Sequence, residues 1–184
     1  IILLSLYVSI TALIFASIFG LLIGYYLAIK NFFLKNFILI ILNSLMGIPP
    51  VVVGLIVYFM FASGGPLGVI QLLYTPTAMI IAQVIIIFPI VTSLSHEIFD
   101  QNWREYKDQL RSINMTFFGV LFIISKHSYF LVITALLSAF GRAISEVGAV
   151  MIVGGNINHF TRVMTTAIAF ETSKGSIEQS MFSP

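Results

Sequence analysis

The sequence predicts an all-helical protein that crosses a lipid bilayer several times. Of its 184 residues, 59% are hydrophobic and only 9% are charged, and the mean hydropathy is +1.05. Soluble domains carry about 25% charged residues. Several apolar runs reach the length of about 20 residues that a helix needs to cross a bilayer. Because lipid offers no hydrogen-bond partners to the backbone, these runs are expected to be helices.

The composition also excludes several classes of function. Cysteine is absent, so the chain forms neither disulfides nor thiolate metal sites. The net charge of +2 is small and scattered, which does not indicate nucleic-acid binding. His96, His127 and His159 lack the spacing of metal ligands, so we expect no metal site and no cofactor. The motifs GxxxxGK[ST], GxSxG and HExxH do not occur, and the sequence predicts no catalytic residue.

Two apolar segments open the chain. The first predicted span covers residues 3–29 and carries several small residues, which let helices approach closely in lipid. The second covers residues 37–62, where Pro49 and Pro50 remove two backbone donors and predict a break at mid-depth. Broken helices in membranes usually face a cavity or a partner helix. Residues 63–75 are uncharged and rich in Gly and Pro, which predicts a loop.

A third span is predicted over residues 76–94, and a short charged helix over residues 96–111. Apolar residues recur on one face of this helix with the helical period. They are Phe99, Trp103, Tyr106, Leu110 and Ile113. We expect this amphipathic helix either to lie on lipid headgroups or to dock against another protein.

The second half of the chain begins with a short apolar run over residues 117–124. A further span is predicted over residues 129–153, and Gly154 and Gly155 follow it. The tail, residues 157–184, is more polar and is predicted to be helical in part.

Arg142 and Glu146 lie one helical turn apart inside that last span. An ionisable side chain at membrane depth costs several kcal/mol unless it has a partner or water. At this spacing the two can pair with each other, or they can line a wet path through a bundle. On a helical wheel they flank a stripe of small residues, which predicts a helix–helix contact and favours a structural pair. The stripe consists of Ser138, Gly141, Ser145 and Gly148.

Lysine and arginine in the connecting segments predict the orientation. Lys30 and Lys35 follow the first span, the loop 63–75 has no cation, and four cations follow the third span. Cytoplasmic loops carry the excess of positive charge. We therefore expect residues 96–127 in the cytoplasm, and the amino terminus and the tail outside.

The chain resembles the permease subunits of ABC importers that carry molybdate, tungstate and sulfate. Residues 105–111 occupy the place of that family's cytoplasmic E-A-A-x-x-x-G loop. Glu105 and the apolar Leu110 match, whereas Tyr106, Lys107 and Arg111 depart from the two alanines and the glycine. The segments GRAISEVGAVMIVGGNI and TRVMTTAIAFETSKG are similar to the tungstate branch. The resemblance extends over about residues 5–176.

The resemblance implies one transmembrane permease domain, residues 1–184, with the type I importer fold, in the inner (plasma) membrane. It implies tungstate import, with molybdate or sulfate as alternatives. The implied partners are a cytoplasmic ABC ATPase that hydrolyses ATP, an extracytoplasmic oxyanion-binding protein and a second permease copy in a homodimer within membrane lipid. The family has a final span after the tail, and SIEQSMFSP ends this chain without one, so we expect a fold that lacks that span. The implied coupling residues are Trp103, Glu105, Leu110 and Arg111, and those of the translocation path or gate are Arg142, Ser145, Glu146 and Thr166.

The competing class is a secondary transporter or channel without a motor. It would need an ion-coupling site at mid-depth, often at a broken helix. Pro49 and Pro50 offer such a break, but no Asp or Glu lies near them in the sequence. Co-purification of an ATPase subunit would distinguish the two classes.

Overall fold

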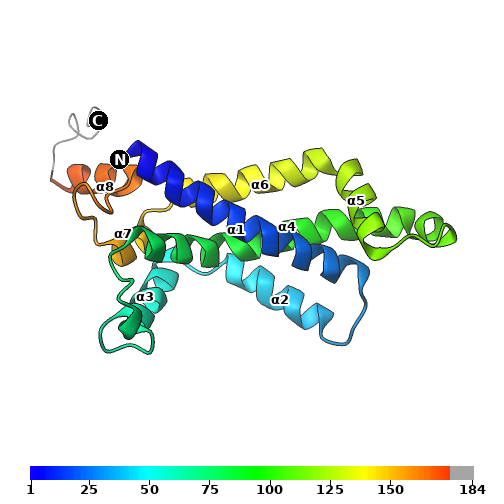
Figure 1. Ribbon diagram of the computed structural model, residues 1–184, viewed down its shortest axis with the longest axis horizontal. Coiled ribbons are helices and arrows are strands. Elements are labelled where there is room, and N and C mark those ends of the chain that lie inside the picture. Colours follow the sequence, from blue (N-terminus) through cyan, green and yellow to red (C-terminus); the bar gives the residue numbers. More distant parts are fainter. Residues whose placement is uncertain (175–184) are drawn as a thin grey trace. The chain divides into compact units, whose positions relative to one another are not determined.

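The computed structural model describes residues 1–174, and these form helices joined by short loops (Figure 1). The prediction of an all-helical protein is confirmed. The end of the tail, residues 175–184, and with it the expected absence of a final span, lies outside the described residues. The helices are α1 (Ile2–Ile29), α2 (Lys35–Met46), α3 (Pro50–Phe61), the 3-10 helix η1 (Gly68–Ile70), α4 (Pro76–Ser112), α5 (Phe117–His127), α6 (Tyr129–Ile144), α7 (Gly148–Gly154) and α8 (Met164–Ser173).

Two helices of the described chain are long and apolar enough to cross a membrane alone, α1 and α4. Two interrupted pairs, α2 with α3 and α5 with α6, each reach the same length and hydropathy when taken together. The axes of α5 and α6 differ by 79°. The described residues therefore supply two crossings, or up to four if each pair is one broken span.

The first half of the chain follows the sequence prediction closely. The first span is confirmed by α1, and the predicted break lies between Met46, where α2 ends, and Pro50, where α3 begins. Proline suits the first turn of a helix, because its missing N–H would have no partner there. The predicted loop 63–75 contains only the single turn of η1.

The charged helix predicted after the third span is not a separate element. It continues the span as α4, one helix of 37 residues with Pro89 inside it. No glycine or proline separates Leu94 from Arg111, so nothing in the backbone ends the helix there. At about 1.5 Å per residue α4 is about 55 Å long, whereas the hydrocarbon core is about 30 Å thick. Its charged end therefore extends beyond the hydrocarbon.

The prediction of one continuous helix over residues 129–153 is wrong. It is interrupted at residues 145–147, so the small-residue stripe does not form one helix face. Within residues 1–174, a Cβ atom at Gly141 would meet no atom of another element within 4 Å, so Gly141 makes no close helix–helix contact there. The short apolar run predicted over residues 117–124 forms α5. At the start of α5, the Thr116 hydroxyl accepts a hydrogen bond from the Gly119 N–H at 3.3 Å.

The chain divides into two compact units, each with a buried apolar cluster. The first comprises residues 1–14, 48–87 and 140 onward, and the second comprises residues 15–47 and 88–139. The buried cluster of the first unit consists of Val8, Met79, Val150 and Val163. That of the second consists of Tyr25, Ala28, Phe99, Leu110, Val120 and Ile124.

Small residues bring helices into close contact in both units. In the second unit, a Cβ at Gly24 of α1 would lie 2.8 Å from the Thr92 carbonyl oxygen of α4. In the first unit, a Cβ at Gly54 of α3 would lie 2.6 Å from the Ala149 Cα of α7. Both contacts involve backbone, so neither can be relieved by turning a side chain.

Candidate functional site

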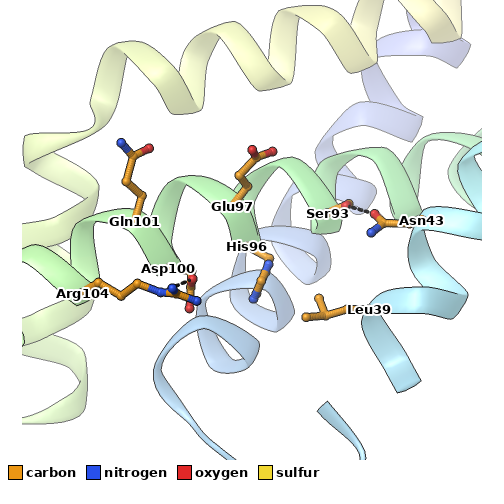
Figure 2. A pocket seen from close by; sticks show the side chains of 8 residues that line it. All are labelled: Leu39, Asn43, Ser93, His96, Glu97, Asp100, Gln101 and Arg104. Atoms are coloured by element: carbon orange, nitrogen blue, oxygen red, sulfur yellow. Dashed lines mark hydrogen bonds and ion pairs between the residues drawn. The ribbon is translucent and has the colours of Figure 1, made fainter. Parts of the chain in front are cut away.

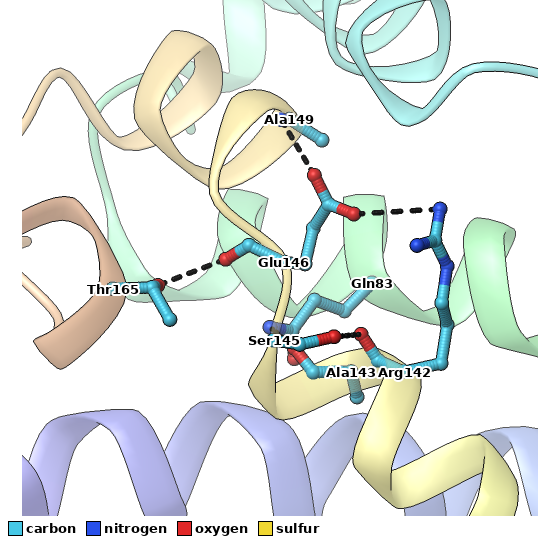
Figure 3. Close-up of polar contacts among 7 residues, drawn as sticks. All are labelled: Gln83, Arg142, Ala143, Ser145, Glu146, Ala149 and Thr165. Carbon is cyan, nitrogen blue, oxygen red and sulfur yellow. Dashed lines mark hydrogen bonds and ion pairs between the residues drawn. The ribbon is translucent and has the colours of Figure 1, made fainter. Parts of the chain in front are cut away.

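The charged pair lies where α6 gives way to α7, with Arg142 in the last turn of α6 and Glu146 in the loop that follows (Figure 3). Glu146 is 6% exposed. One of its carboxylate oxygens, Oε1, accepts a hydrogen bond from the Ala149 N–H at 3.2 Å, and the other, Oε2, lies 3.8 Å from Arg142 Nη2. A carboxylate at the start of a helix satisfies a backbone donor that has no partner within the helix. Glu146 therefore caps α7 and holds Arg142 at the same time.

The pairing of Arg142 with Glu146, left open by the sequence, is present in the structure. It does not depend on a shared helix, because α6 ends at Ile144 and Glu146 lies beyond it. The Arg142 side chain is 41% exposed, and the Ser145 hydroxyl donates to the Arg142 carbonyl at 3.1 Å. The guanidinium thus has one partner on its buried side and an open side.

Two side chains that the sequence did not indicate fix this loop from other elements. Gln83, in the middle of α4, donates from Nε2 to the Ala143 carbonyl at 3.0 Å, and its Oε1 is buried without a partner. The Thr165 hydroxyl of α8 donates to the Glu146 carbonyl at 2.9 Å. The only sign of either contact in the sequence was an amide side chain, that of Gln83, inside an apolar span.

Thr166, the fourth expected path residue, is used elsewhere. It is fully buried, and its hydroxyl accepts from the Val163 N–H and donates to the Val163 carbonyl, both at 3.1 Å. This pattern satisfies backbone groups at the start of α8. The structure brings Arg142, Ser145 and Glu146 together and assigns Thr166 to the end of a different helix.

The expected coupling residues lie on the charged end of α4, in the second unit. Leu110 is 7% exposed and belongs to the buried cluster of that unit. Trp103 is half-buried, and the Arg111 guanidinium lies over its ring at 5.6 Å. Glu105 is exposed. The Glu105 carboxylate, as a hydrogen-bond acceptor, raises the pKa of Tyr106 above its ordinary value. Of the four, Glu105 and Arg111 are exposed, and Arg111 lies against Trp103.

The amphipathic face of this helix is largely confirmed. Phe99 and Leu110 are buried, and Trp103 and Tyr106 are half-buried, but Ile113 is 62% exposed and lies past the helix end. There the chain turns at Asn114, whose φ of 48° is the left-handed conformation that Gly and Asn adopt most readily. The Met115 N–H then donates to the Leu110 carbonyl at 3.3 Å. Asn114 therefore ends α4, although the family's glycine position is held by Arg111.

A polar pocket of 570 Å³ lies between α2 and α4 in the second unit (Figure 2). Asp100 is one of its lining residues and forms ion pairs with two side chains, Lys35 at 3.6 Å and Arg104 at 2.8 Å. Ser93 donates to the Asn43 side chain, and His96 Nε2 is buried without a partner. Both signs of charge line the pocket, so it does not select an anion. The Lys35–Asp100 pair instead fastens the start of α2 to α4, and the Arg104–Asp100 pair lies within α4.

The fold and these contacts together indicate the class of protein. A multi-pass helical chain, with a charged helix end outside the hydrocarbon and a partly buried ion pair where a span is interrupted, fits a membrane transport subunit. Residues 3–180 match the family described as the binding-protein-dependent transport system inner membrane component, and the chain belongs to that family.

Individual relatives show the same relationship over most of the chain. A probable anion ABC transporter permease protein of Haloferax volcanii is 39% identical over 179 residues, 95% of this chain and 77% of that protein. The tungstate uptake system permease protein TupB of Peptoclostridium acidaminophilum is 42% identical over 175 residues, which again cover 95% of this chain and 77% of that protein. TupB of Campylobacter jejuni is 38% identical over 145 residues, 79% of this chain and 61% of that protein.

Family membership confirms several sequence predictions. The chain is a multi-pass inner-membrane subunit of an ABC importer and is not itself catalytic. It works with an ATPase and with a substrate-binding protein. The family therefore separates this chain from transporters that have no motor.

Proposed function

We propose that this chain is the membrane-spanning permease subunit of an ATP-driven tungstate importer. The observation that carries the proposal is its 42% identity to a tungstate uptake permease over 95% of the chain. Molybdate and sulfate are tetrahedral dianions of the same kind and are the alternative substrates. A subunit of this class supplies the passage, while its partners supply ATP hydrolysis and capture of the ion.

The Arg142 region is the part of the chain that we assign to the translocation path or gate. Its side chain is 41% exposed, and its guanidinium has Glu146 as a partner on one side only. A dianion leaving water needs a compensating positive charge. The carboxylate of Glu146 keeps Arg142 in place and also weakens the electrostatic attraction between Arg142 and the anion. A passing ion is thereby guided without being trapped.

Uptake by cells tests the substrate. Cells that express this permease with its ATPase and binding protein should accumulate tungstate, measured by elemental mass spectrometry. Excess unlabelled tungstate should suppress uptake of a tracer far more than equal molybdate or sulfate. Equal suppression by all three would contradict a tungstate-specific system, and uptake that persists without the ATPase would contradict an ATP-driven one.

The charged end of α4 is the part that we assign to the ATPase contact, with residues 96–127 in the cytoplasm and residues 157–184 outside. Exposed Glu105 contacts the ATPase directly. Buried Leu110 anchors the helix end to the core of its own unit. Trp103 and Arg111 stack on each other and fix the shape of that end.

A second permease copy completes the passage in this proposal. Support comes from α6, where Phe130, Ile133 and Leu137 are exposed by 69%, 49% and 63%. Gly141 on the same helix has open space around it. Small residues on an exposed helix let another helix approach closely in lipid.

Reversing the charge of Glu105 should uncouple the two subunits. We expect Glu105→Lys to abolish tungstate-stimulated ATP hydrolysis in reconstituted vesicles while the permease still inserts and folds, because an exposed side chain supports no internal packing. Glu97→Lys is the matched control, since Glu97 is an exposed glutamate two turns earlier on α4. If both variants hydrolyse ATP at the wild-type rate, the coupling assignment of Glu105 is wrong.

A further inference from the structure

A second cavity in the second unit differs in character from the polar pocket. It has a volume of 430 Å³ and lies among α1, the loop after it, the end of α4 and the start of α5. Its walls are aromatic and aliphatic, with two cations and no carboxylate among the lining residues. The lining includes Tyr25, Lys30, Trp103, Arg111 and Phe117.

The two cations of this cavity have no carboxylate partner. Within the part of the chain that the structure describes, neither Lys30 nor Arg111 forms an ion pair, and both are exposed. Arg111 lies over the Trp103 ring at 5.6 Å, which orients its guanidinium without neutralising it. The cavity therefore carries two positive charges, and the ligand that complements it is an anion with an apolar part.

The level of the cavity in the membrane follows from α1. Residues 1–29 carry no charged side chain, and Lys30 is the first charge of the chain. The 28 residues of α1 are about 42 Å long, close to the thickness of about 40–45 Å of a bilayer with its headgroups, so the cavity at the end of α1 lies at the level of the headgroups. Tryptophan and tyrosine are enriched at that depth, and Trp103 and Tyr25 both line the cavity.

Exposed aromatic side chains continue from two edges of the cavity. After Asn31, a lining residue, come Phe32 and Phe33, which are 37% and 100% exposed. After Phe117, another lining residue, come Phe118 and Phe122 of α5, 74% and 70% exposed. Large apolar side chains in such number are costly in water but are stabilised among acyl chains.

From this charge and location we infer that the cavity binds an anionic phospholipid of the cytoplasmic leaflet. Lys30 and Arg111 hold the phosphate, and the aromatic side chains along both edges contact the acyl chains. The inference is independent of which ion the permease carries. It uses the proposed orientation only to name the leaflet. A bound lipid would fasten the end of α1 to the charged end of α4, the element assigned to the ATPase contact.

The chain provides its own probe, because Trp103 is its only tryptophan. We would place the full permease in nanodiscs whose lipids carry brominated acyl chains, which quench tryptophan on contact. Brominated phosphatidylglycerol should quench Trp103 at a several-fold lower mole fraction than brominated phosphatidylcholine. Each cation near an anionic surface changes lipid affinity about fivefold. Lys30→Gln and Arg111→Gln should each reduce the preference by about that factor.

Lys126→Gln is the control, because Lys126 is an exposed cation of α5 that does not line the cavity. Its preference should match that of the wild type. Each variant is compared with its own phosphatidylcholine curve, which corrects for the effect of Arg111 on Trp103 emission. Native mass spectrometry should retain phosphatidylglycerol on the wild type but not on Lys30→Gln.

Three results would overturn the inference. Equal quenching by both lipids would show that the cations do not select a phosphate. Reversal of the preference by millimolar inorganic phosphate or tungstate would identify a site for free oxyanions. Loss of quenching by both lipids on addition of the ATPase would show that protein fills the cavity. None of these results depends on transport, so the proposed function stands or fails separately.

Discussion

Replacing Gly54 by alanine should lower the free energy of unfolding by about 1–3 kcal/mol, the usual effect of forcing extra atoms into a packed contact. The new methyl group would lie 2.6 Å from the Ala149 Cα. Because that atom belongs to the backbone of α7, the two helices must move apart. Leucine at the same position should prevent α3 and α7 from packing. The measurement is the thermal unfolding midpoint of the purified permease, with size-exclusion chromatography to detect aggregates.

Gly141→Ala is the matched control for this experiment. Gly141 is also inside a helix, but a Cβ there would meet no atom within 4 Å. Alanine is favoured over glycine in helices by about 0.8–1 kcal/mol, so the monomer of this variant, in which no second copy meets Gly141, should be unchanged or slightly more stable. An equal loss of stability in Gly54→Ala and Gly141→Ala would show that close contact with α7 is not what requires glycine at position 54.

The sequence predicted those parts of the fold that local chemistry determines. A charge-free run as long as the one before Lys30 can form only a membrane helix, and α1 is that helix. Pro49 and Pro50 remove two donors, so a helix must end before them wherever it packs. The spacing of Phe99, Trp103 and Leu110 identified the face of α4 that the second unit buries.

Other boundaries depend on contacts between distant residues. The charged end of α4 was predicted as a separate helix because its hydropathy changes, but a change of surroundings does not break the backbone. Conversely, residues 145–147 interrupt an apolar run that reads as one span. The observed partner of Glu146 in the next helix, the Ala149 N–H, could not be read from the sequence.

The candidate site likewise combines contacts that the sequence predicts with contacts that depend on distant residues. The spacing of Arg142 and Glu146 was enough to predict that they could pair, and they do. Gln83 lies 60 residues before its acceptor, and no local rule connects the two. The helical wheel placed Ser145 and Gly148 with Gly141 because it assumed one continuous helix. The broken helix instead directs Gly148 against Val51 of α3 and leaves Gly141 in open space.

The charged pair is expected to be asymmetric, because Glu146 is 6% exposed and Arg142 is 41% exposed. Replacing Arg142 by methionine leaves a buried carboxylate with one N–H donor, which should cost about 2–3 kcal/mol. Breaking a fully buried pair costs about 3–5 kcal/mol, and the exposure of Arg142 reduces the effect. Glu146→Gln should cost only about 1 kcal/mol, because the amide oxygen still accepts from Ala149 and the arginine can turn outward.

The double variant Arg142→Met with Glu146→Gln separates a structural pair from a path residue. Its stability should return to within about 1 kcal/mol of the wild type, since no buried charge remains, giving a coupling energy of about 2–3 kcal/mol in the double-mutant cycle. Losses that simply add would show that the 3.8 Å contact carries no energy. If Arg142 also guides the oxyanion, tungstate uptake should stay impaired in the double variant despite its restored stability. Recovery of uptake together with stability would confine the pair to holding α6 and α7 together.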